Sequence, residues 1–111
     1  MIALIDYGAG NLTSVRKALA AIGAEHRTPA APGELAGARV IIVPGVGHFQ
    51  ATARLDEAWR AAIRAKVDEG CPLLGVCVGM QWLYEGSTEA PDVPGLGLLK
   101  GGCERLLDRD P

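Results

Sequence analysis

The sequence is poor in aromatic residues and contains no long hydrophobic run. Phe, Trp and Tyr make up only 5% of the 111 residues, so aliphatic side chains must fill most of the core, and 49% hydrophobic residues are enough to build one. The longest apolar runs, such as Val40–Val43, are far too short to cross a bilayer. Asp6 and Gly8 interrupt any signal-peptide pattern. We therefore expect a globular domain with no membrane segment, located by default in the cytoplasm.

The sequence also lacks a positive charge excess and metal-ligand spacing. The formal net charge is -2, with Lys and Arg interspersed among Asp and Glu, which argues against nucleic-acid binding. Cys71, Cys77 and Cys103 are an odd number without a two-residue spacing, and His26 and His48 stand far apart. We expect reduced thiols, no metal site and no cofactor.

Short apolar runs alternate with segments of helical periodicity. The runs predict buried strands at 2–5, 40–43 and 73–76, a weaker extended segment near 24–28 and a candidate strand from Leu96 onward. The periodic segments predict three helices. One face of the first helix is formed by Leu12, Val15, Leu19 and Ile22, and one face of the second by Leu55, Trp59, Ile63 and Val67. The third helix is predicted at 78–84. This order predicts a single α/β domain over 1–111, a three-layer α-β-α fold with a mainly parallel, doubly wound sheet.

The segment Gly75-Val76-Cys77-Val78-Gly79 is the cysteine version of a nucleophile elbow. In an elbow, a sharp turn between strand and helix lifts the nucleophile above the sheet edge, and small residues on both sides leave room for crowded backbone. Cys77 is then the candidate nucleophile, and the amide of Val78 would point at an oxyanion. The alternative is that Cys77 is a small buried core residue. Cys71 and Cys103 lack flanking glycines and are interpreted as structural.

A second glycine-rich loop, Pro44-Gly45-Val46-Gly47, follows the strand at 40–43. Such a loop can aim backbone amides at a ligand and supply the other half of an oxyanion site. The alternative is a plain turn. The neighbouring His48 could serve as a base or a ligand, but we expect a surface histidine, and Asp6–Gly8 could be a mere turn between strand and helix.

Taken together, these segments resemble a known family. Residues 6–12, 43–47 and 75–81 are similar to the glutaminase subunit of imidazole glycerol phosphate synthase, a class I glutamine amidotransferase. Residues 84–87 and 94–98 fit as well, so the resemblance covers essentially all of the chain. It implies that Cys77 attacks the side-chain amide of glutamine, releases ammonia and forms a glutamyl thioester that water hydrolyses. The resemblance places Gly45, Val46 and Val78 around the oxyanion site.

The same resemblance implies a substrate site and a partner. Gly47 and Gln81 would hold the glutamine, and Asn11 would lie at the interface with a (β/α)₈-barrel cyclase subunit that receives the ammonia for histidine biosynthesis. The loop at 44–47 would rearrange when the partner is loaded, which leaves the lone subunit nearly idle.

The sequence departs from the family in one respect. The family's triad is Cys, His and Glu, with the last two in a late His-Pro-Glu segment that is not found here, and neither His26 nor His48 matches that position. We therefore expect a truncated domain with an incomplete sheet and little or no glutaminase activity by itself. Two alternatives are another enzyme with a cysteine elbow, including the PfpI/DJ-1-like proteins, and a half-domain that acts only as an interaction module.

Overall fold

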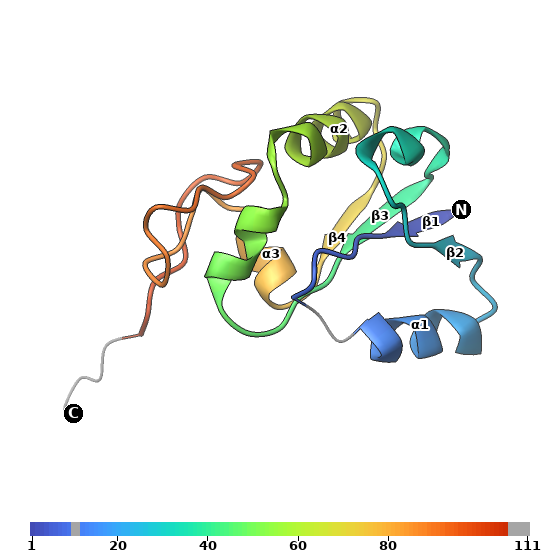
Figure 1. The fold of residues 1–111 in the computed structure, drawn as a ribbon, viewed down its shortest axis with the longest axis horizontal. Coiled ribbons are helices and arrows are strands. Elements are labelled where there is room, and N and C mark those ends of the chain that lie inside the picture. Colours follow the sequence, from blue (N-terminus) through green and yellow to red (C-terminus); the bar gives the residue numbers. More distant parts are fainter. Residues whose placement is uncertain (10–11, 107–111) are drawn as a thin grey trace.

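The computed structural model describes residues 1–9 and 12–106 and consists of an open sheet with helices on both sides (Figure 1). The strands are all parallel in the order β2-β1-β3-β4, and they are β1 (Ile2–Leu4), β2 (His26–Arg27), β3 (Val40–Val43) and β4 (Leu73–Gly75). The α-helices are α1 (Leu12–Ala21), α2 (Glu57–Asp68) and α3 (Val78–Trp82), and the 3₁₀ helices are η1 (Pro32–Gly37) and η2 (Phe49–Arg54). The predicted α/β class and parallel sheet are confirmed.

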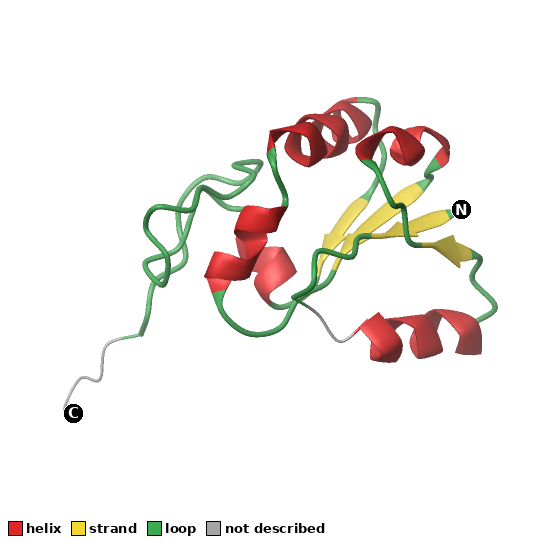
Figure 2. Ribbon diagram, viewed as in Figure 1, coloured by secondary structure: helices red, strands yellow, loops and turns green. Residues whose placement is uncertain are grey.

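Two apolar clusters give the fold its three layers. Because successive residues of a strand point to opposite faces, Ile42 of β3 packs toward Leu19 of α1, whereas Ile41 belongs to the larger cluster on the other face. That larger cluster contains Leu35 of η1 and Ile63 of α2. Figure 2 shows α1 on one side of the sheet and α2 with η1 on the other. The predicted α-β-α layering is confirmed.

The prediction that residues 73–76 form a fully buried strand is wrong in part. β4 lies at one edge of the sheet, and Leu73 packs against the larger cluster, but the Leu74 side chain is 55% exposed on the opposite face. The prediction for the buried face of the first helix is also wrong at its last residue. Ile22 follows the last residue of α1 and is 78% exposed, while Gly23 ends the helix with a φ of 72°.

The candidate strand from Leu96 onward is not formed, because this part of the chain is held as a loop against α2. Arg60 donates to the carbonyl oxygens of Pro94 and Gly95 at 3.1 and 2.8 Å, and Arg64 donates to that of Leu96. These carbonyl oxygens are satisfied by side chains rather than by a neighbouring strand. In the part of the chain that the structure describes, no helix is long and apolar enough to span a membrane.

Candidate functional site

Cys77 lies in the sharp turn between β4 and α3. Its φ of 54° and ψ of -121° make it the one non-glycine residue with a positive φ within residues 1–9 and 12–106. Such a conformation is sparsely populated for a residue with a Cβ, and it is typical of positions where strain serves a function. The residue is exposed with a free thiol. The segment therefore has the geometry of a nucleophile elbow, and the alternative of a buried core cysteine is wrong.

Two glycines make this turn sterically possible. A Cβ on Gly75 would lie 2.5 Å from the Cα of Met80, and a Cβ on Gly79 would overlap the carbonyl oxygen of Val43. Both positions are therefore restricted by close backbone approach rather than by an unusual φ. The elbow is packed directly against the end of β3, from which the second glycine-rich loop starts.

The amides expected at the oxyanion site donate to carbonyl groups of the chain itself. The N–H of Val78 donates to the carbonyl oxygen of Gly45 at 3.0 Å. The N–H of Val46 donates to the carbonyl oxygen of Ala9 at 2.7 Å. The structure thus brings the elbow and the loop at 44–47 into direct contact, but it does not direct these two amides at a common ligand position.

The buried side chain of Tyr7 contacts the loop at 44–47. Its side chain is only 6% exposed, and its hydroxyl donates to the carbonyl oxygen of Pro44 at 2.5 Å. Burial raises the pKa of Tyr7 from 10.0 to about 12. A Cβ on Gly45 would overlap the Tyr7 hydroxyl. Sequence reasoning treated this position as part of a turn, and the one signal was an aromatic residue two positions after the predicted strand at 2–5.

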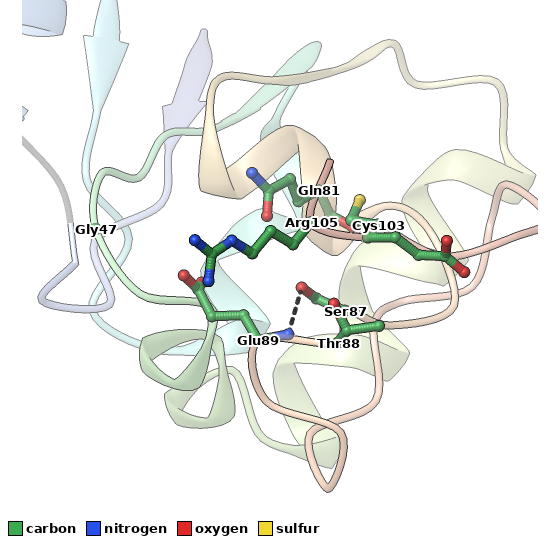
Figure 3. Close-up of a pocket in the computed structure, with 8 residues that line it drawn as sticks. Gly47, Gln81, Ser87, Thr88, Glu89, Cys103 and Arg105 are labelled. Carbon is green, nitrogen blue, oxygen red and sulfur yellow. Dashed lines mark hydrogen bonds between the residues drawn. The ribbon is translucent and has the colours of Figure 1, made fainter. Parts of the chain in front are cut away.

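A cavity of about 520 Å³ lies beside α3, the helix that follows Cys77. It is lined by Gly47, Gln81, Ser87, Thr88, Glu89, Cys103, Glu104 and Arg105 (Figure 3). The two residues expected to hold substrate, Gly47 and Gln81, are therefore brought together, whereas Cys77 does not line this cavity. Cys103, interpreted as structural, lines the cavity and is half-buried.

The cavity carries charged side chains that sequence reasoning missed. Glu89 accepts a hydrogen bond from the N–H of Phe49 at 2.6 Å, which holds its carboxylate at the start of η2. In Figure 3 the guanidinium of Arg105 points toward the carboxylate of Glu89. Both residues lie in irregular segments without a motif, so spacing gave no signal for them.

The remaining candidates are placed as follows. His48 is exposed and caps η2, with its Nδ1 accepting from the N–H of Gln50 at 3.0 Å, so the predicted surface histidine is confirmed. His26 lies on β2, at the sheet edge opposite to β4 and Cys77. Asn11, the expected partner contact, lies outside the described residues. No group of three His, Cys, Asp or Glu residues among those described could hold a metal ion.

The chain matches a family model and several known proteins. The family model "Glutamine amidotransferase class-I" matches residues 3–93. The chain is 48% identical over 114 residues to imidazole glycerol phosphate synthase subunit HisH of Bacillus velezensis, which covers 99% of this chain and 53% of that protein. It is 50% identical over 108 residues to the subunit of the same name from Geobacillus kaustophilus, covering 96% and 51%.

A solved structure supports the fold. A crystal structure of a glutamine amidotransferase superimposes with a TM-score of 0.79 at 27% sequence identity, covering 95% of this chain and 57% of the other. The chain thus spans about half the length of the curated relatives it matches.

Proposed function

Because the chain belongs to the class I glutamine amidotransferase family, we propose that it carries the nucleophile half of the glutaminase subunit of an imidazole glycerol phosphate synthase. The complete subunit would hydrolyse glutamine to glutamate and ammonia, and the ammonia would pass to a (β/α)₈-barrel cyclase subunit in histidine biosynthesis. The observation that carries the proposal is the strained, exposed Cys77 inside a family match that spans residues 3–93. The three free cysteines agree with a cytoplasmic location.

In the proposed reaction, the sulfur of Cys77 attacks the side-chain amide carbon of glutamine. The C–N bond breaks, ammonia leaves with a proton from a general acid, and a glutamyl thioester remains. Water then attacks the thioester carbon, releasing glutamate and the thiol. Each attack places negative charge on the carbonyl oxygen, and N–H donors near Val78 and Val46 would stabilise it.

Rotation of a single peptide unit would make those N–H groups available to the oxyanion. The carbonyl oxygen of Gly45 and the N–H of Val46 belong to the same peptide unit, so turning that unit breaks both hydrogen bonds described above. The N–H of Val78 would be released, and that of Val46 would swing toward the elbow. The need for this rotation supports the proposal that the lone chain is nearly idle and that a partner bound near Asn11 promotes the active arrangement.

The cavity has the chemistry expected of a glutamine site. The α-carbon of glutamine carries an ammonium and a carboxylate, and the cavity offers the opposite charges on Glu89 and Arg105 next to the polar amide of Gln81. Gly47 borders the same cavity without a side chain to fill it. We propose that the amino-acid end of the substrate lies here, with its amide directed toward Cys77.

The general base is the part of the machinery that we do not assign to this chain. His26 lies at the opposite sheet edge, and the Nδ1 of His48 is engaged at the start of η2. A cysteine without a paired histidine lacks the group that shuttles its proton. We therefore propose that this chain alone hydrolyses little or no glutamine.

The deciding experiment measures glutamate release from glutamine by the chain, with and without the barrel cyclase and its nucleotide ligand. The lone chain should release almost none, and a pull-down should retain it on the cyclase. Robust hydrolysis that Cys77→Ala abolishes would contradict the proposed idleness, since a base would then be present. Failure of the folded chain to bind the cyclase would contradict the assignment to this enzyme.

One observation favours a second candidate function. Among the described residues β4 is an edge strand, and with the exposed Leu74 it leaves apolar surface and a free strand edge available to another chain. An interaction module would use this edge and would not need Cys77. Association that survives Cys77→Ala but is lost on substitution of Leu74 would favour this function.

A further inference from the structure

We propose that Tyr7 is a positioning residue for the loop at 44–47. Its hydroxyl anchors the carbonyl of Pro44, so that the rotation needed for an oxyanion site is confined to the next peptide unit, between Gly45 and Val46. The purpose of that rotation rests on the proposed function, whereas the anchoring can be measured without it.

The anchor joins two rigid groups. Tyr7 lies with Val43 in the larger apolar cluster, and its hydroxyl reaches across 37 residues of sequence to the carbonyl oxygen of Pro44 at 2.5 Å. The pyrrolidine ring of Pro44 already restricts its φ to a narrow range. The ring therefore limits rotation about the N–Cα bond of Pro44, and the phenol limits rotation about the next bond, Cα–C, which orients the peptide unit between Pro44 and Gly45.

Gly45 separates this anchored unit from the one that turns. A Cβ at Gly45 would meet the Tyr7 hydroxyl on one side and would lie 3.3 Å from the amide nitrogen of Gly79 on the other. Glycine fits this narrow space and also allows the wide range of ψ that a peptide rotation requires. The same tyrosine that holds Pro44 thus makes glycine necessary at the hinge.

The anchor does not select between the two orientations of the loop. The bond from Tyr7 ends on the Pro44 carbonyl, outside the rotating unit, so it can persist whichever way that unit points. The bonds to Ala9 and from Val78 exist in only one orientation. An interaction that is equal in two states does not shift their populations, so Tyr7 determines where the loop sits and not which way it faces. A phenol is protonated at neutral pH, so Tyr7 acts as the donor there, and its raised pKa extends this range to higher pH.

The test is amide hydrogen exchange, followed by NMR, on the 111-residue chain and its Tyr7→Phe variant. Phenylalanine keeps the ring in the core and removes only the hydroxyl. We expect exchange at Val46 and Val78 to become up to about tenfold faster, the scale of one neutral hydrogen bond, because these amides exchange when the whole loop leaves its place and the Tyr7 bond breaks with it. Exchange at Ile41 in β3 should stay unchanged. The carbonyl ¹³C resonance of Pro44 should move upfield, because it loses its hydrogen bond.

Tyr84→Phe is the matched control. It removes the same group from the chain's other tyrosine, whose hydroxyl makes no hydrogen bond with the described residues. Exchange at Val46 should not respond to it. Equal acceleration at Ile41 and Val46 in Tyr7→Phe would overturn the proposal, since the hydroxyl would then serve only general stability. Unchanged exchange at Val46 would also overturn it. Neither result depends on glutamine hydrolysis, so an inactive chain would leave the anchoring role intact.

Discussion

Gly79, two residues after the candidate nucleophile, lies so close to the carbonyl oxygen of Val43 that a Cβ on the glycine would overlap that oxygen. The contact connects α3 to the end of β3, and it brings the elbow to within hydrogen-bond distance of the loop that follows β3. The exposure of Cys77 and the position of the loop at 44–47 therefore depend on the same close backbone approach.

Gly79→Ala should destabilise the chain by about 2 kcal/mol or more, because either the elbow or β3 must move to admit the methyl group. Gly33→Ala is the matched control. A Cβ on Gly33 meets nothing within 4 Å, so its effect on the free energy of unfolding should stay within about 0.5 kcal/mol. Urea denaturation of both variants measures the difference, and equal effects would contradict the steric requirement at Gly79.

Cys77→Gly should be more stable than Cys77→Ala by about 1 kcal/mol. Glycine adopts the observed φ of 54° without the strain that a Cβ imposes, and part of this gain is offset by the greater entropy of glycine in the unfolded chain. Both variants remove the thiol, so the comparison isolates backbone strain from chemistry. Thermal and urea unfolding measure it. Equal stability of the two variants would mean that Cys77 is not strained in solution.

Tyr7 should give the chain an alkaline limit of stability. Burial raises its pKa from 10.0 to about 12, so the folded state holds the phenol proton more tightly than the unfolded chain does. This contribution is fully present below about pH 10 and is lost as the pH rises toward 12. The ultraviolet absorbance of tyrosinate should follow the ionisation of Tyr7 near pH 12.

In Tyr7→Phe the tyrosinate signal expected near pH 12 should disappear, and the free energy of unfolding should fall less between pH 10 and 12 than in the unsubstituted chain. Ionisation of Tyr7 near its ordinary pKa of 10.0 would contradict its burial.

Leu74→Lys should reduce self-association while changing the free energy of unfolding by less than about 0.5 kcal/mol. The side chain is 55% exposed on an edge strand, where a charge discourages strand pairing and little packing is lost. Leu4→Ala provides the contrast. Leu4 is fully buried between the sheet and α1, so its truncation should cost about 2–5 kcal/mol. Sedimentation velocity and urea unfolding test both expectations.

The spacing of apolar residues predicted the elements that depend mainly on nearby sequence. β3 occupies the predicted residues, and α2 carries the predicted Ile63 at its buried centre. Leu55, expected on the same helical face, is buried but lies before α2, at the end of η2. Neither 3₁₀ helix was predicted, because such short turns have no 3.6-residue period to reveal them.

Exposure and loop conformation could not be predicted in the same way. Leu74 matches the apolar pattern of a buried strand, and its exposure follows from the position of β4 at the edge of the sheet. Leu96 is in a similarly apolar stretch, yet arginines on α2 bind the backbone carbonyls there. Both outcomes depend on which segments become neighbours after folding, and such pairings involve residues far apart in sequence.

The sequence by itself determined the parallel α/β layering, the glycine-flanked turn at Cys77 and the family, because each depends on residue types at short, regular spacing. Tertiary structure alone decided that the amides of Val78 and Val46 donate to the chain's own carbonyl oxygens and that Tyr7 supports Pro44. Hydrogen bonds of this kind join loops that are separated by dozens of residues. Their partners are therefore chosen by packing of the whole domain, not by any pattern within a loop.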